Sequence, residues 1–331
     1  TFSPGTVGPV GFGTPGTGDN NAATPDFVGT VTSTNLAATP INSNLSGIDA
    51  GDIVRFAVVV ENTGSSRLGA FDVALRDTIP AGFVVPGSGL KLSVTDGTGA
   101  ALPFTDLGGG LFGSGLMLND PGATAATGDG SNGGALDAFN ATSGRNIVIV
   151  TYDLVLASTV SPNSNLTNTA TLISYAGAEG SPNHIPGGLT DTAVVTIAQP
   201  IVDKVITTTN QPHTTGTNVA IGEIVTYTVT VTVPEGQSAS TQLVDTLDAG
   251  LGFVDIVSIT PSSGALTSSA GTYAAIASAA AFGSVGAGAV NAGRLMTVNF
   301  GTLTNSDTNN ATAETLTIVY RAAVLNTTTN V

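Results

Sequence analysis

The feature that most constrains this sequence is an internal repeat with a period near 170 residues, the signature of tandem structural units. Four pairs of segments carry the repeat, at offsets of 175, 171, 168 and 168: residues 25–35 with 200–210, 51–56 with 222–227, 77–79 with 245–247, and Tyr152 with Tyr320. The offset shrinks along the chain, which places small length differences in the loops between elements, where they are tolerated.

The matched segments alternate between apolar and other residues with period 2, the pattern of half-buried strands. The predicted inward positions are Val54, Phe56, Val58 and Val60 with Val148, Val150, Tyr152 and Leu154 in the first repeat, and Val225, Tyr227, Val229, Val231 and Val233 with Leu316, Ile318, Tyr320 and Ala322 in the second. Thr226, Thr228, Thr230 and Thr232 form the opposite face of one strand. Turn-forming residues separate these strands, which favours an all-β chain of tandem antiparallel β-sandwiches.

We expect three parts: an extended Gly/Pro-rich arm over residues 1–24, a first sandwich over 25–198 and a second over 199–331. The uncharged stretch 256–292 is rich in Ala, Gly and Ser and contains Pro261. A membrane-spanning helix needs about 20 strongly apolar residues. We therefore predict loops and strands with one helical turn near residues 273–282, and no membrane insertion.

Composition excludes several classes of protein. The 331 residues include only 8 Lys and Arg against 23 Asp and Glu, a net charge of −15 that cannot neutralise a row of nucleic-acid phosphates. There is no Cys, which excludes disulfides and thiol chemistry. The only histidines are His184 and His213, and no nucleophile–base motif accompanies them. We predict a protein that is not an enzyme. The chain begins at Thr1 rather than Met, which fits an exported, processed product as well as a trimmed chain.

The second repeat stops before its last strand. In the first repeat Asn168 follows Tyr152 by 16 residues, and a strand over 191–197 comes later. The position equivalent to Asn168 would be 336, and the chain ends at Val331. Two interpretations remain open. The chain is a fragment of a longer protein, or a neighbouring subunit supplies the missing strand to an open edge, for example through residues 1–24.

Aspartates gather in turns and loops. The group with the spacing of an oxygen-rich calcium loop is Asp129, Ser131, Asn132 and Asp137, with Asp120 and Asp106 as further ligands. Calcium takes six to eight oxygen ligands, and this spacing supplies three or four of them. The alternative is that Asp serves only as a good turn residue. Asp77 and Asp245 recur just before a turn, where a repeated turn cap is favoured over a carboxylate pair.

Residues 51–64, 73–83 and 168–172 resemble the bacterial surface-protein repeat family known as DUF11, and the second repeat is similar to the D2 domains of fimbrial proteins. The resemblance covers residues 25–331 and implies tandem Ig-like sandwiches in large exported proteins. Some D2 domains form an internal Lys–Asn isopeptide bond promoted by an acidic residue. Here Lys204 matches the lysine, Gly29 replaces it in the first repeat, and the asparagine matching Asn168 falls beyond the chain.

These observations predict a secreted or cell-surface structural protein that associates with copies of itself in a surface layer, filament or fibrous adhesin. The alternative is a calcium-dependent adhesin domain that binds a glycan or a host surface through the loops around Asp106–Asp137. An enzyme such as a glycosidase is the third and least favoured hypothesis.

Overall fold

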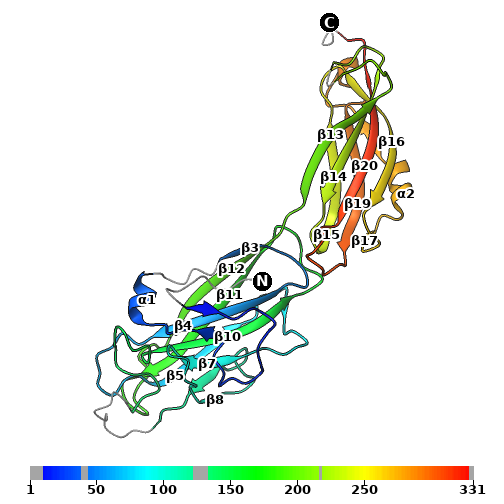
Figure 1. The fold of residues 1–331 in the computed structure, drawn as a ribbon. Coiled ribbons are helices and arrows are strands. Elements are labelled where there is room, and N and C mark those ends of the chain that lie inside the picture. The colour runs from blue at the N-terminus through cyan, green and yellow to red at the C-terminus, as the bar shows by residue number, and fades with distance from the viewer. Residues whose placement is uncertain (1–9, 39–43, 122–132, 216–217, 328–331) are drawn as a thin grey trace. The chain divides into compact units, whose positions relative to one another are not determined.

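The structure is a computed structural model that describes residues 10–38, 44–121, 133–215 and 218–327 (Figure 1). The chain is nearly all β and divides into two compact units: Thr1–Ala157 with Asn165–Thr196 form unit 1, and Ser158–Ser164 with Ile197–Val331 form unit 2. The strand pairs that build the main sheets of both units are antiparallel. The predicted class, tandem Ig-like antiparallel β-sandwiches, is confirmed by these sheets.

Unit 1 contains two main sheets. One has four strands, β4 (Ile53–Glu61), β10 (Ile147–Leu156), β6 (Phe83–Val84) and β7 (Ser93–Asp96). The other has six strands in the order β3 (Leu45–Ile48), β12 (Leu189–Ile197), β11 (Asn165–Ala176), β5 (Phe71–Thr78), β9 (Leu116–Leu118) and β8 (Phe104–Asp106). The N-terminal part adds the pair β1 (Gly11–Phe12) and β2 (Phe27–Val28), followed by α1 (Ser33–Ala38).

Unit 2 repeats this plan with fewer strands. Its first sheet has the order β13 (Ile201–Thr209), β14 (Ile224–Thr232), β20 (Thr315–Val324) and β16 (Leu251–Pro261). Its second has β15 (Gly236–Thr246), β19 (Leu295–Asn305) and β17 (Leu266–Ser268), with β18 (Ala281–Gly283) also on β19. The helices are α2 (Tyr273–Ser278), which confirms the predicted helical turn, and the 3-10 turn Ala289–Asn291. No helix in the described residues is long and apolar enough to cross a membrane.

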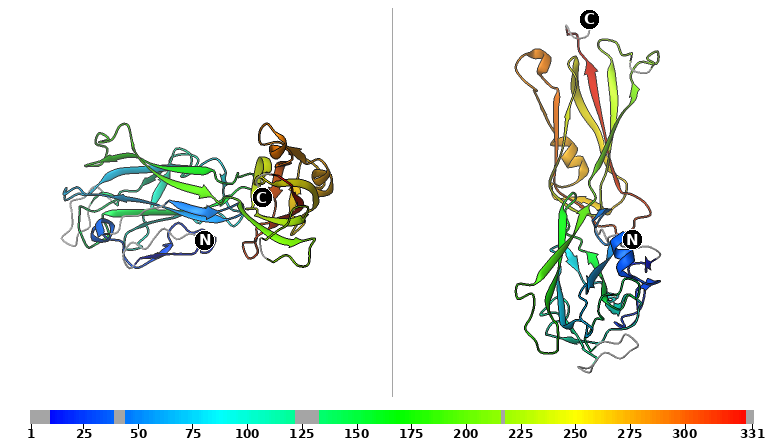
Figure 2. Two further views of the ribbon diagram at one scale, coloured as in Figure 1. Left: turned by 90° about the horizontal axis from the view of Figure 1, so that it is seen from above. Right: turned by 90° about the vertical axis from the view of Figure 1, so that its left-hand side faces the viewer.

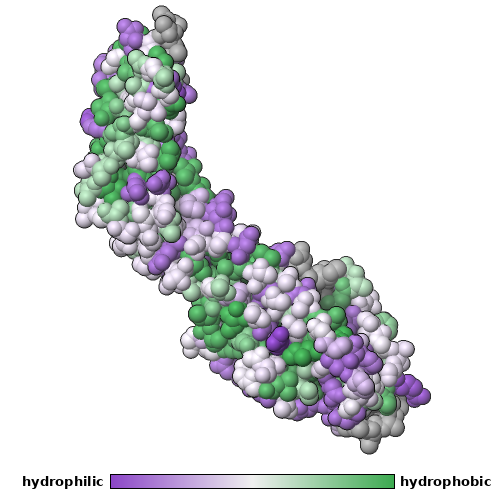
Figure 3. All heavy atoms as spheres, turned by 180° about the vertical axis from the view of Figure 1, so that it is seen from behind, coloured by the Kyte–Doolittle hydropathy of each residue, from purple (hydrophilic) through white to green (hydrophobic). Residues whose placement is uncertain are grey.

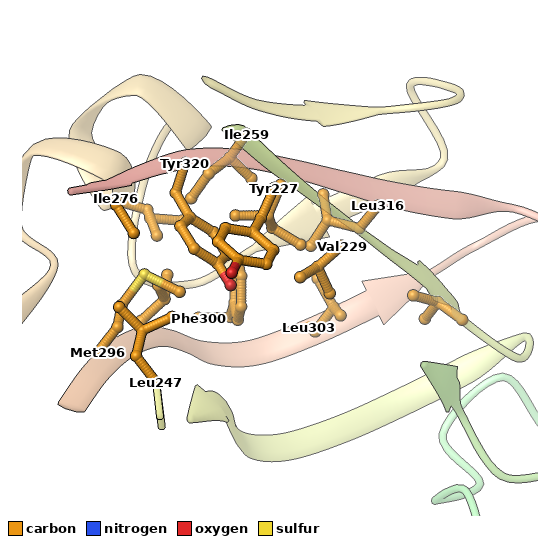
Figure 4. Packing of buried hydrophobic residues seen from close by; sticks show 14 of the residues in the cluster. Tyr227, Val229, Leu247, Ile259, Ile276, Met296, Phe300, Leu303, Leu316 and Tyr320 are labelled. Carbon is orange, nitrogen blue, oxygen red and sulfur yellow. The ribbon is translucent and has the colours of Figure 1, made fainter. Parts of the chain in front are cut away.

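The core of unit 2 consists of the residues that period-2 alternation selected, together with partners from the second sheet (Figure 4). Val229 and Leu316 from the first sheet lie on the side of Leu303 from β19, and Ile318 and Met296 belong to the same buried cluster. The rings of Tyr227 and Tyr320 stack with their centroids 5.2 Å apart. Both tyrosines are buried, so their hydroxyl groups need partners inside the sandwich.

Corresponding strands differ in how many of their faces are buried. β20 alternates between buried inward residues and more exposed outward ones such as Thr317. β10 is buried at nearly every position because its outward residues Ile147 and Ile149 are apolar as well. A strand that is apolar on both faces needs a cover on both sides. In unit 1 the N-terminal segment supplies that second cover.

Residues 10–31 of the N-terminal segment lie against the outer face of the β4–β10 sheet (Figures 1 and 2). Val10, Phe12, Phe27 and Val31 form one buried cluster with Ile147 and Ile149. The described part of the expected arm, residues 10–24, therefore packs on its own unit; residues 1–9 lie outside the described residues.

The strand expected over residues 25–35 is wrong for most of its length. Only Phe27 and Val28 form a strand, and α1 begins at Ser33. The reason is local hydrogen bonding, because the backbone N–H of Asn35 donates to Thr32 Oγ1 and the Thr32 N–H donates to Asn35 Oδ1. This reciprocal capping favours a helix start over an extended strand.

A buried ion network fastens the N-terminal segment to the sheet. Arg55 on β4 donates to both carboxylate oxygens of Asp153 on β10, at 2.7 and 2.9 Å. The same guanidinium lies 3.3 Å from Asp26 and donates to the carbonyl of Thr17, while the Gly16 N–H donates to Asp153. Arg55 and Asp153 are fully buried, so each charge depends on the other for compensation.

We expect Asp153→Asn to destabilise unit 1 by about 3 kcal/mol, because it leaves the buried Arg55 with only part of its compensation. It should also make the segment around residues 10–31 sensitive to limited proteolysis. The measurements are calorimetric unfolding and protease mapping.

The matched control is Asp255→Asn, which breaks the exposed Arg321–Asp255 pair on unit 2. Surface pairs contribute little, so we expect little change. If the two substitutions changed the unfolding free energy equally, Asp153 would not be the residue that holds the N-terminal segment against the sheet.

Candidate functional site

A tyrosine–aspartate hydrogen bond crosses the sandwich at the same place in both units. In unit 1 the hydroxyl of Tyr152, on β10, donates to Asp77 Oδ2, on β5, at 2.7 Å. In unit 2 the hydroxyl of Tyr320, on β20, donates to Asp245 Oδ2, on β15, at 2.5 Å. The partners are 75 residues apart in each case. Each aspartate thus joins the two sheets of its unit, a role that the turn-cap interpretation did not foresee.

In unit 1 an asparagine completes this cluster. Asn168 on β11 donates through Nδ2 to the Tyr152 hydroxyl at 2.7 Å and to Asp77 Oδ2 at 3.2 Å. All three side chains are buried, and Asp77 Oδ1 and Asn168 Oδ1 have no hydrogen-bond partner in the structure. Burial raises the pKa of Asp77, and burial together with the charge of Asp77 raises the pKa of Tyr152 well above its ordinary value.

In unit 2 a lysine takes the place of the third partner. Lys204 Nζ, on β13, lies 2.8 Å from Asp245 Oδ1. The ammonium also lies over the rings of Tyr227 and Tyr320, 4.8 and 5.6 Å from their centroids, within cation–π range. Burial and the hydrogen bond to Asp245 raise the pKa of Tyr320. The Lys204 side chain is 34% exposed and that of Asp245 12%, so solvent reaches this cluster.

The exposure follows from the sheet edges beside the cluster. β5 in unit 1 has strand neighbours on both sides, β9 and β11, whereas the equivalent β15 has only β19 in the described residues. β13 is likewise the last strand of its sheet. The Lys204–Asp245 pair thus joins two edge strands from opposite sheets. We call the cluster of Lys204, Asp245 and Tyr320 the edge site. It includes the edge of β15 that has no strand neighbour in the described residues.

The isopeptide bond of some D2 domains requires a lysine and an asparagine in the same unit. The described residues place Asn168 in unit 1 and Lys204 in unit 2. Gly29, which replaces the lysine in the repeat alignment, has a φ of 102° and lies outside any strand. The unit 1 cluster therefore holds Asp77 and Asn168 without a lysine from that position.

The structure describes three of the six predicted calcium ligands, Asp106, Asp120 and Asp137. Asp129, Ser131 and Asn132 lie outside the described residues. Asp106 Oδ1 accepts hydrogen bonds from the N–H groups of Gly108 and Gly110, which is a loop-capping role. The backbone N–H of Asp137 donates to the carbonyl of Arg145.

Asp120 instead meets two acidic residues that the sequence did not indicate. Asp72, Asp120 and Glu179 have carboxylate oxygens within 4.8 Å of one another. Burial raises the pKa of Asp120, and the neighbouring Glu179 and Asp72 add to the effect. Glu179 is distant in the sequence and belongs to no motif, so only the strand pairing of β5 and β11 brings it near. Calcium binding by the six ligands that the sequence predicted stays a prediction.

Comparison with known proteins gives only distant likenesses. No family model matches the sequence, and no curated protein matches it. The C-terminal domain of the antigen I/II-family protein AspA of Streptococcus pyogenes is 13% identical over 86% of each chain, with a TM-score of 0.30. The T6 backbone pilin of Streptococcus pyogenes is 12% identical over 85% of this chain and 55% of that chain, with a TM-score of 0.23.

A family 123 glycoside hydrolase from Clostridium perfringens is 9% identical over 55% of this chain and 27% of that chain, with a TM-score of 0.25. The chain thus spans about a quarter of the hydrolase and about half of the pilin. At these scores the fold assignment depends on the sheets described above, and no function is transferred.

The equivalent substitutions Asp77→Asn and Asp245→Asn should have opposite effects at neutral pH. Asp77 has a raised pKa, so its ionised form costs stability that an amide does not, and the amide oxygen can still accept from Tyr152 and Asn168. Asp77→Asn should therefore stabilise unit 1. The gain should shrink as the pH falls through the raised pKa of Asp77, because the folded wild type then takes up a proton.

Asp245→Asn removes the partner of Lys204 and should destabilise unit 2 by about 1 kcal/mol or less, since the pair is partly exposed. Differential scanning calorimetry between pH 4 and 8 measures both effects. If Asp77→Asn instead lowered the stability of unit 1 by the same amount at every pH, Asp77 would not be a buried carboxylate whose ionised form costs stability.

Proposed function

We propose that the chain is part of an extracellular structural protein whose Ig-like units associate with further copies, as in a surface layer, a filament or a fibrous adhesin. The observation that carries this proposal is β13, an edge strand that exposes apolar residues on both faces. Ile201, Val202, Val205 and Ile206 are all exposed there. An open apolar edge recruits other chains. β13 has Asp203 and Lys204 between its two apolar pairs and a bulge between Ile206 and Thr208, so its exposed apolar side chains flank a short charged stretch.

The rest of the surface supports close packing between copies. Charged side chains are few, and most of the surface seen in Figure 3 is white or green rather than purple. The outer face of the β14–β20 sheet carries Thr226, Thr228 and Thr230 beside Thr317. Hydroxyl groups on a sheet face can pair with a neighbouring surface at a smaller desolvation cost than charged groups. The same face also carries Asp203, opposite Thr230, and Arg321, opposite Thr226.

The test is sedimentation velocity combined with electron microscopy of the purified chain over a range of concentrations. We expect concentration-dependent ordered assemblies, and we expect the double substitution Val202→Lys with Ile206→Lys to abolish them by placing charge on the edge. Val254→Lys on β16 changes an exposed valine elsewhere on unit 2 and serves as the control. A wild-type chain that stays monomeric at all concentrations would contradict the proposal.

A second candidate function is a calcium-dependent adhesin, which the cluster of Asp72, Asp120 and Glu179 favours. Three carboxylates are a reasonable beginning of a calcium site, and backbone carbonyls would have to complete it. If calcium binds here, millimolar calcium raises the unfolding temperature of unit 1, and Asp120→Asn removes that rise. An unchanged unfolding temperature in calcium and in chelator would eliminate this candidate.

A further inference from the structure

The direction of the backbone groups in β14 decides which groups of β13 are left open. The N–H of Val233, directly after β14, donates to the carbonyl of Glu314, directly before β20. This bond continues the pairing of β14 with β20. Backbone groups alternate in direction along a strand. Thr228 and Thr230 therefore face the other neighbour of β14, which is β13.

β13 has three regular positions on its open side. Asp203 and Val205 lie opposite the two threonines, so their N–H and C=O groups point toward β14. The same groups of Val202, Lys204 and Ile206 point away from β14, to a side where the described residues place no strand. We call these three backbone positions the β13 edge.

A proline and a bulge limit the β13 edge to one short stretch. Pro200 directly precedes β13 and has no N–H, so it cannot donate to a strand on the open side. At the other end the register with β14 shifts between Ile206 and Thr208. A bulge of this kind interrupts regular pairing. A partner strand therefore finds regular hydrogen-bonding groups only over residues 202–206.

The two charges in this stretch lie on opposite faces of the sheet. Lys204 points inward, where its ammonium lies 2.8 Å from Asp245 Oδ1 and is compensated within the chain. Asp203 lies on the outer face opposite Thr230, and no described cation forms an ion pair with it. Like charges directly opposite each other destabilise a strand pair. A partner strand with an acidic residue opposite Asp203 is therefore disfavoured.

These limits select one way in which the β13 edge can pair with a copy of itself. Opposed residues of an antiparallel pair lie on the same face of the sheet, so a two-fold axis between identical strands passes beside one residue rather than between two. An axis at Asp203 sets two aspartates against each other, and one at Val205 sets Val202 against the bulge. An axis at Lys204 uses all three open positions and sets Val202 of each copy against Ile206 of the other.

We propose that the β13 edge binds the β13 edge of a second copy of this chain, antiparallel and about a two-fold axis at Lys204. Main-chain hydrogen bonds join the two sheets, and each ammonium at the axis keeps Asp245 of its own chain as its partner. A two-fold contact requires a self-complementary surface, which this stretch provides. The inference rests on the proposed function and deepens it, since it names the surface and the partner through which copies associate.

The chain has no cysteine, so paired cysteine substitutions test this register directly. In the proposed dimer Asp203 of one copy and Val205 of the other form a pair without hydrogen bonds, with Cα atoms about 4.5 Å apart. We expect a mixture of Asp203→Cys and Val205→Cys chains to form a disulfide-linked dimer at least about tenfold faster than either variant alone, because only the mixture brings two cysteines within disulfide range. Mass spectrometry identifies the link between positions 203 and 205.

The matched control is a mixture of Val254→Cys and Val257→Cys chains. Both valines are exposed on β16, the edge strand at the other side of the same sheet. Both occupy the extra positions of bulges, which keep that edge from regular pairing. This mixture should oxidise no faster than its single variants.

Val202→Pro should weaken the dimer by about tenfold or more, because it removes one N–H from the β13 edge of each copy and is tolerated on an edge strand. Sedimentation equilibrium measures the dissociation constant. Val257→Pro, on the other edge of the sheet, should leave that constant unchanged. The unfolding temperatures of both variants verify that unit 2 remains folded.

The proposal would be overturned if the mixture of Asp203→Cys and Val205→Cys chains cross-linked no faster than either variant alone. An unchanged dissociation constant in folded Val202→Pro would also overturn it. Ordered assemblies without the link between positions 203 and 205 would overturn it as well, while the proposed function would stand. A linked dimer that never assembles further would support the β13 pairing and contradict the proposed function.

Discussion

The hydrogen bond from a core tyrosine to an aspartate of the opposite sheet is the interaction on which both units depend. A buried hydroxyl and a buried carboxylate are each costly without a partner, so Tyr152 with Asp77 and Tyr320 with Asp245 fix how the two sheets face each other. The segments between the partners differ, since unit 1 has β6–β9 there and unit 2 has β16, β17, α2, β18, the 3-10 turn and β19. The sheets nevertheless return the same pair to the same contact.

What differs between the units is the third partner of the aspartate. In unit 1, β11 brings Asn168 to Asp77 and closes the edge of the sheet, which leaves a carboxylate with a raised pKa and no cation beside it. In unit 2, Lys204 balances the charge of Asp245, and the edge of β15 has no strand beside it in the described residues. One cluster is therefore buried inside its unit, and the other is partly exposed to solvent in the described residues.

The sequence predicted the elements whose pattern is repetitive and local. Alternation predicts β4, β10, β14 and β20, and the repeat alignment matches Asp77 with Asp245 and Tyr152 with Tyr320, which make equivalent contacts in the structure. The Arg55–Asp153–Asp26 network was missed because its members lie far apart in the chain and meet only when the N-terminal segment folds onto the sheet. The run Ile147–Val150, apolar at four successive positions, was the signal that β10 needed a cover on both faces.

The candidate sites were harder to predict than the fold, because they depend on which loops meet. Asp120 was singled out, but its neighbours Asp72 and Glu179 come from positions that no spacing rule connects. Lys204 was identified through its resemblance to a family lysine, yet its contact with Asp245 follows from the two sheets meeting at their edges. Local pattern therefore predicts strands well. An ion pair between two sheets can be predicted only when the strand register of both sheets is known.

Equivalent strand edges are covered in unit 1 and, within the described residues, without a neighbouring strand in unit 2. Residue-resolved hydrogen exchange of the free chain tests this difference most directly, by comparing the amides of Arg76 and Thr78 with those of Val244 and Thr246. We expect slow exchange for the first pair, which faces β11, and fast exchange for the second pair. Comparable protection of all four amides would show that the edge of β15 is already covered, and would contradict the account.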